Sequence, residues 1–132
     1  LTPKYQTRYG SYAIPLIIFD PQKPTPIQHH FTCQQIDILP TILDLLNYPH
    51  TTFSLGESVF KPNRKNIAVS YLNNSWMMIQ NDTLLELNNE HYSYYLFKKD
   101  SLTKKPLQLQ STQQQQLLKA IIQTYIHSLT NN

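Results

Sequence analysis

The sequence predicts an α/β fold, and three observations support this prediction. A continuous apolar run at residues 14–19 indicates a buried strand, and a segment with apolar residues at helical spacing follows it. Short β-rich runs separated by asparagines then precede a final amphipathic helix. With 132 residues, of which 40% are hydrophobic, the chain is large enough to bury the core of one ordinary domain.

The first element is the run Ile-Pro-Leu-Ile-Ile-Phe at residues 14–19. Its lack of polar alternation is typical of a strand that is covered on both faces, as in a parallel sheet. Pro15 has no N–H and therefore belongs at the start of the strand, while Asp20 and Pro21 end it. Residues 21–30 contain three prolines and are expected to form an extended loop.

The second element is a helix over residues 37–47, whose apolar side chains recur at helical spacing. Asp37 is the predicted N-cap, because this start leaves Pro40 in the first turn, where its missing N–H costs little. The alternative start at Thr32, with Gln35 completing a capping box, would place the proline inside the helix. Asn47 is expected to end the helix.

Residues 66–97 predict an antiparallel meander. Asparagines stand at each expected turn, where they tolerate the positive φ that tight hairpins need. The expected strands are residues 67–72, 76–80, 84–87 and 92–97, and the expected turns are Asn73-Asn74, Asn81-Asp82 and Asn88-Asn89.

The last element is a C-terminal amphipathic helix. Ser111 is its predicted cap, with Gln114 three residues later. We expect its apolar stripe to pack on the strand of residues 14–19 or on the tyrosine-rich meander. The stripe consists of Leu117, Leu118, Ile121, Ile122, Tyr125, Ile126 and Leu129.

Composition excludes several classes of protein. The chain has two glycines, too few for a Walker loop or a dinucleotide-binding fingerprint. Cys33 is its only cysteine and cannot form an intrachain disulfide. The net charge of +3 is modest and comes without a long basic run, which disfavours nucleic acid as a partner.

Two segments, taken in their order along the chain, resemble segments of a known family. Residues 9–21, Tyr-Gly-Ser-Tyr-Ala-Ile-Pro-Leu-Ile-Ile-Phe-Asp-Pro, are similar to the sulfatase-family strand of the form "iPLiiydP". Residues 35–46, which include Asp-Ile-Leu-Pro-Thr, are similar to the family's following helix, "qiDi-PTllddl". Residues 53–60 resemble the "fG-slf" segment after that helix, and the meander resembles the region that closes many bacterial members. The likeness is strongest to the lipoteichoic-acid-synthase-like branch, which includes phosphoglycerol transferases.

The resemblance implies the C-terminal part of an alkaline-phosphatase-like sandwich. It implies a parent enzyme that cleaves or transfers a sulfate or phosphate ester through a metal-held threonine, serine or formylglycine nucleophile. The chain contains no Asp-His-Gly, no Cys-x-Pro-x-Arg around Cys33 and no recognisable nucleophile motif. Catalytic residues and metal ligands are therefore expected upstream, none within this chain, and the divalent metal is expected only in the parent enzyme.

The same resemblance gives the remaining expectations. Residues 1–65 should end the catalytic-domain scaffold, and residues 66–132 should add the meander and final helix, packed with it as one unit. The expected partners are the upstream catalytic segment and the ester substrate. Membrane contact is expected only through upstream helices of the parent, in an extracytoplasmic location, periplasmic or in the cell envelope.

Lys4 and Arg8 are the candidate substrate-binding residues. They precede the expected strand, where family geometry places the rim of the active site, and a cation there could pair with an anionic head group. The alternative interpretation is that Lys4 and Arg8 belong to an ordinary solvated loop. His29 and His30 are adjacent and lack a third ligand nearby, so a surface pair is the preferred interpretation. Asp37 and Asp44 are seven residues apart, which favours a cap over paired catalytic carboxylates.

Two further functional hypotheses stay open at this stage. The chain can be a free-standing α/β scaffold or binding module without chemistry of its own. A nucleic-acid-binding module, suggested by Tyr92, Tyr94, Tyr95 and Phe97 beside two lysines, is the weaker option. Strand alternation divides these aromatics between two faces, which is typical of core packing.

Overall fold

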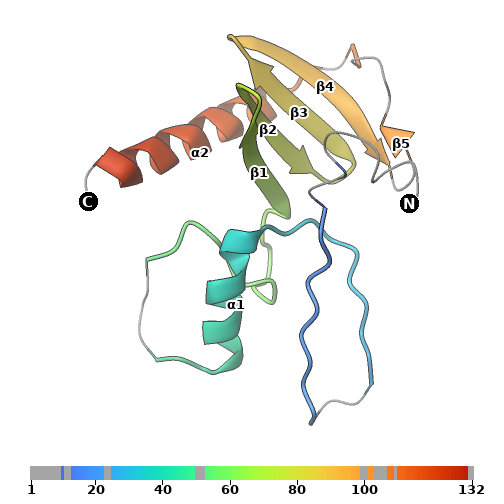
Figure 1. Ribbon diagram of the computed structural model, residues 1–132, viewed down its shortest axis with the longest axis vertical. Coiled ribbons are helices and arrows are strands. Elements are labelled where there is room, and N and C mark those ends of the chain that lie inside the picture. The colour runs from blue at the N-terminus through green and yellow to red at the C-terminus, as the bar shows by residue number, and fades with distance from the viewer. Residues whose placement is uncertain are drawn as a thin grey trace.

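The computed structural model describes residues 10, 13–22, 25–49, 53–98, 101–102, 107–108 and 110–130. It has a mixed α/β fold, built from an antiparallel sheet and two helices (Figure 1). In chain order the elements are η3 Gln35–Asp37, α1 Ile38–Leu45, β1 Ile67–Leu72, β2 Ser75–Gln80, β3 Thr83–Asn88, β4 His91–Lys98, β5 Ser101–Leu102 and α2 Thr112–Thr130. The sheet and α2 lie together, while α1 and its flanking loops extend from the start of β1.

The predicted meander is confirmed. Strands β1 to β4 pair with their sequence neighbours in antiparallel register, and the short strand β5, which was not predicted, continues the order. Asn73 and Asn74 connect β1 and β2 with φ of 48° and 59°, and Asn81 begins the next turn with φ of 53°. The last turn uses Asn89 and Glu90, one residue later than expected. Asparagine supplies positive φ at low cost, which fixes these tight connections.

One face of the sheet and the first half of α2 enclose the core. Register places Met78, Leu85 and Tyr94 side by side on neighbouring strands, and Leu118 of α2 packs against them. These four side chains are at most 2% exposed. Around them pack Val69, Trp76, Leu87, Tyr92, Leu107, Leu117, Ile121 and Ile122. The expected core packing of Tyr92 and Tyr94 is thereby confirmed, and the meander is the surface on which α2 docks.

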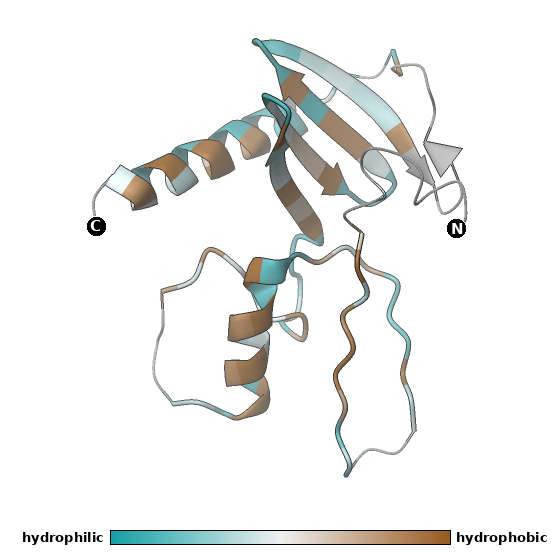
Figure 2. Ribbon diagram, viewed as in Figure 1, coloured by the Kyte–Doolittle hydropathy of each residue, from teal (hydrophilic) through white to brown (hydrophobic). Residues whose placement is uncertain are grey.

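Helix α2 begins at its predicted cap. The N–H of Gln114 donates to Ser111 Oγ at 3.3 Å, and the hydroxyl of Tyr94 contacts both the N–H and the carbonyl of Ser111 at 3.1 Å. The apolar stripe continues past the sheet (Figure 2). Its last members, Tyr125, Ile126 and Leu129, are 44%, 50% and 63% exposed. The contact of the stripe with the sheet therefore weakens toward its end, where the ring of Tyr125 meets that of Trp76 edge-on at 6.0 Å.

The predicted helix at residues 37–47 is present but begins differently. A single 3₁₀ turn, η3, precedes α1, and Asp37 belongs to that turn. Its carboxylate makes no cap bond to α1 and instead accepts from the N–H of Gln34 at 3.0 Å. Asp37 therefore occupies the predicted N-cap position of α1, but its carboxylate caps the preceding turn instead of α1. At the other end Asn47, with φ of 49°, ends the helix as expected.

The expectation of a buried strand at residues 14–19 is wrong for the described chain. These residues are assigned to no strand or helix, and Ile17 and Phe19 are 82% and 85% exposed. A strand needs a neighbour to receive its N–H and C=O groups. In the described sheet the strands pair with one another in the order β1-β2-β3-β4-β5, and none of them pairs with residues 14–19.

Candidate functional site

The predicted substrate-binding residues Lys4 and Arg8 lie outside the described residues. The predicted role therefore stays a prediction. His29 and His30 are exposed, and the ring of His29 lies 5.3 Å from that of Phe31. Within the described ranges there is no group of three His, Cys, Asp or Glu side chains that could hold a metal ion.

The strongest polar constellation is centred on Asp37 and Arg64. Asp37 Oδ2 lies 2.8 Å from Arg64 Nη2, and the two side chains are only 3% and 7% exposed. Because a buried charge is costly unless it is paired and hydrogen-bonded, this pair must be held in a well-defined geometry. Asp37 Oδ1 accepts a further hydrogen bond from the N–H of Glu57 at 2.9 Å.

Arg64 connects three segments that are distant in sequence. Its Nη1 donates to the carbonyl of Thr32 at 3.2 Å and to Asn66 Oδ1 at 3.3 Å. The guanidinium carbon also lies 5.3 Å from the centroid of the Phe31 ring, within the range of a cation–π contact. Arg64 Nε is buried without a partner in the described structure. The Asp37–Arg64 pair thus fastens the segment before η3, the segment after α1 and the start of β1 to one another.

A second set of hydrogen bonds fastens α1 to residues 53–60. Thr41 Oγ1 donates to the carbonyl of Asp37 at 2.6 Å and accepts from the N–H of Val59 at 3.0 Å. Ser58 Oγ donates to Asp44 Oδ2. Asp44 is therefore a structural hydrogen-bond acceptor, and its partner, Ser58, differs from the partners of Asp37.

Gly56 allows these two segments to approach closely. A Cβ at this position would lie 2.1 Å from the carbonyl oxygen of Ile36, well inside any real contact distance. Only glycine can therefore occupy the position without moving backbone. Gly56 is one of two glycines in the chain and stands in the segment that resembles the family's "fG-slf", a signal that sequence reasoning did not use. No sequence pattern indicated a role for Arg64, since its partners Asp37 and Thr32 are 27 and 32 residues away.

Two titratable groups in this region have shifted pKa values. Burial raises the pKa of the Cys33 thiol; nearby Arg64 opposes this rise and Asp37 adds to it. The thiol is therefore protonated at neutral pH, and the thiolate is the nucleophilic form. The hydrogen bond from Lys61 is the main cause that lowers the pKa of Glu57. The hydrogen bonds of this region connect η3 and α1 to the segments around them.

Comparison of the chain with protein-family models, with curated proteins and with solved structures gives no match. Neither helix in the described part of the chain combines the length and apolar character that crossing a membrane requires.

Proposed function

We propose that this chain is the C-terminal structural part of a sulfatase-type metal-dependent hydrolase or phosphoglycerol transferase acting on sulfate or phosphate esters. In this proposal the nucleophile and metal ligands belong to residues that precede Leu1. The observation that carries it is the apolar segment at residues 14–19, which is extended over an apolar helix face and lacks sheet partners in the described structure. The motifs at residues 9–21 and 35–46 supply the choice of family.

Exposure alternates along residues 14–19 as it does in a strand. Leu16 and Ile18 are 40% and 44% exposed, whereas Ile17 and Phe19 are 82% and 85% exposed. Leu16, Ile17 and Ile18 line an apolar hollow of about 250 Å³ together with Ile38, Thr41 and Ile42 of α1. The segment therefore lies beside the apolar residues of α1, while Ile17 and Phe19 remain 82% and 85% exposed.

The free energy available for completing this layer is large. Fully burying one isoleucine, leucine or phenylalanine side chain stabilises by about 1.5–3 kcal/mol. Ile17 and Phe19 alone would therefore contribute roughly 3–6 kcal/mol if a sheet and a second helix covered them. Parallel sheets with helices on both faces supply such cover, and the catalytic domain of the resembled family is expected to contain one.

In the proposed enzyme the Asp37–Arg64 pair has a supporting role. It connects the start of α1 to Glu57 and to Asn66, which precedes β1, so that α1 presents a fixed apolar face to residues 14–19. Lys4 and Arg8 are proposed to lie at the active-site rim, where either cation would pair with the anionic ester. The divalent metal would be held by upstream residues, as the family resemblance implies. An extracytoplasmic location belongs to the same proposal.

The test begins with the coding sequence upstream of Leu1. We expect an Asp-His pair shortly before this residue and a nucleophile motif further upstream. The protein containing those residues should hydrolyse aryl phosphates or aryl sulfates in the presence of a divalent metal, and the chain of 132 residues should not. A start codon directly before Leu1, or a longer protein that lacks these motifs, would contradict the proposal.

A non-catalytic binding module is the second candidate. The observation that favours it is that the meander and α2 enclose their own core around Leu118 without help from residues 14–19. Stable folding of residues 66–132 alone, in a gene with no upstream catalytic motif, would favour this second function.

A further inference from the structure

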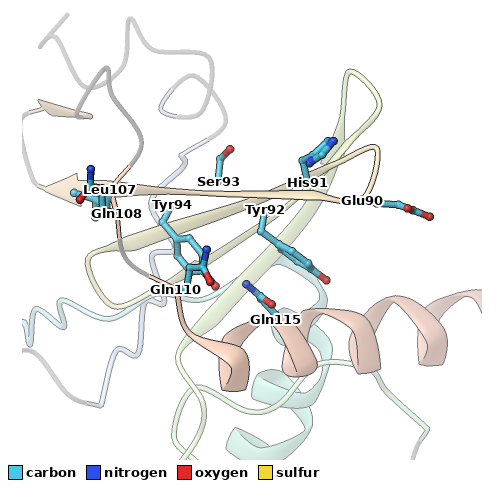
Figure 3. Close-up of a pocket in the computed structure, with 9 residues that line it drawn as sticks. All are labelled: Glu90, His91, Tyr92, Ser93, Tyr94, Leu107, Gln108, Gln110 and Gln115. Carbon is cyan, nitrogen blue, oxygen red and sulfur yellow. The ribbon is translucent and has the colours of Figure 1, made fainter.

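A polar hollow of about 560 Å³ lies at the outer edge of β4, beside the start of α2 (Figure 3). Tyr92, Tyr94 and Gln115 lie on the α2 side of the strand, whereas His91 and Ser93 point to the other side. The hollow therefore curves around the strand edge. Its volume lies within the range of about 300–1,000 Å³ that is typical of small-molecule sites.

The wall of the hollow is fixed by hydrogen bonds around Tyr94. The N–H of Leu107 donates to the carbonyl of Tyr94 at 2.6 Å, and the hydroxyl of Tyr94 contacts Ser111. Gln114 joins the same corner to the sheet, because its Nε2 donates to Gln80 Oε1 at 3.2 Å. A site held in this way loses little entropy on binding. The bond from Leu107 also blocks the strand edge at Tyr94, which disfavours an added peptide strand.

The lining side chains combine amides with aromatic and aliphatic surface. Gln108, Gln110 and Gln115 each have a donor and an acceptor, which match the paired donor and acceptor character of a hydroxyl group. Tyr92 and Leu107 add an apolar surface for the C–H groups of a ring. The described lining contains no lysine or arginine, and Glu90 lies beside His91.

The hydroxyl of Tyr92 is a further unused polar group at this site. It is buried and has no hydrogen-bond partner in the described structure. Lys119 Nζ lies 5.9 Å from the centroid of the same ring and does not line the hollow. Buried hydroxyl groups are usually satisfied, so the unpaired hydroxyl of Tyr92 is unusual.

We propose that this hollow binds a neutral polyhydroxylated ligand of the size of one or two sugar rings. The side-chain amides of Gln110 and Gln115 hydrogen-bond to the hydroxyl groups of the sugar, and the side chain of Tyr92 packs against the sugar ring. This site goes beyond the proposed function and does not rest on it, because none of its residues belongs to the segments 9–21 and 35–46 that carry that proposal.

The test is a titration of the ¹⁵N-labelled chain, followed by amide chemical shifts, with methyl glucoside, N-acetylglucosamine, maltose and glycerol as probes. Inorganic phosphate and acetate serve as anion probes. We expect saturable shifts confined to residues 90–94 and 107–115 with at least one of the sugars. Gln110→Ala and Gln115→Ala should each weaken that binding by about 3- to 10-fold, the range that one hydrogen bond contributes.

Gln123→Ala, at an exposed position of the same helix, is the matched control and should leave the affinity unchanged. Alanine favours helix, so neither helix variant should disturb α2, and dispersed amide spectra will verify that. The proposal is overturned if none of the sugars gives saturable shifts at these residues. It is also overturned if phosphate or acetate binds there in preference to the sugars, or if both glutamine variants retain full affinity.

Discussion

Leu118→Ala is the substitution that most directly probes how α2 contributes to the fold. Leu118 is fully buried among Met78, Leu85 and Tyr94, whereas Leu129 of the same helix is 63% exposed. Removing a leucine side chain from a packed core costs about 2–5 kcal/mol, because transfer free energy is lost and a cavity remains. The same substitution at an exposed position usually changes stability by about 0.5 kcal/mol or less.

Urea denaturation can measure this difference through the fluorescence of Trp76, the only tryptophan, which packs against the core cluster. Leu118→Ala should lower the unfolding midpoint substantially, and Leu129→Ala should lower it little or not at all. Ile122→Ala should fall between them, because Ile122 is half-buried at the margin of the same cluster. Equal midpoints for the Leu118 and Leu129 variants would refute the docking of α2 on the meander.

Three other predictions concern the Asp37–Arg64 region. Asp37→Ala leaves Arg64 buried without its carboxylate partner, and should lower the free energy of unfolding, measured by denaturation, by about 3–5 kcal/mol. The double variant Asp37→Leu with Arg64→Met, which replaces both charges by apolar side chains, should restore part of that loss. Gly56→Ala should cost about 1–3 kcal/mol, because its Cβ forces the backbone of Ile36 to move; an unchanged midpoint would contradict the close approach. The pKa of the Cys33 thiol is raised in the folded chain. The contribution of this thiol to the free energy of unfolding is therefore fully present below the ordinary pKa of 9.0, and it is lost as pH rises through the pKa of the folded state. Iodoacetamide should accordingly alkylate Cys33 more slowly in the folded chain than in urea at neutral pH, and equal rates would oppose this.

The meander could be predicted from the sequence because its determinants are local. Each hairpin is fixed by two adjacent residues that accept positive φ, such as Asn73 and Asn74, between runs of β-forming residues. The start of α2 was equally local, since Ser111 and Gln114 are three residues apart. Only its contact surface required the folded structure, because nothing in the stripe distinguishes Leu118 from Leu129.

The failures have a common physical cause, which is dependence on distant residues. An apolar run such as residues 14–19 indicates that a strand will be buried when neighbours exist, but the run does not contain those neighbours. Asp37 was expected to act as a local cap, and Arg64, 27 residues later, turned out to be its main ionic partner. No spacing rule joins these two residues, so their pairing could be found only in the structure.

Hydrogen exchange at residues 14–19 tests the central proposal most directly. In the chain of 132 residues these backbone groups have no hydrogen-bond partner in the described structure, so their amides should exchange rapidly, as in an open segment. In a longer protein that carries the residues preceding Leu1, the proposal predicts that the amides of Leu16, Ile17 and Ile18 become protected to the level of β2 and β3. Exchange that remains as fast in the longer protein would contradict the assignment of this segment to the catalytic-domain sheet.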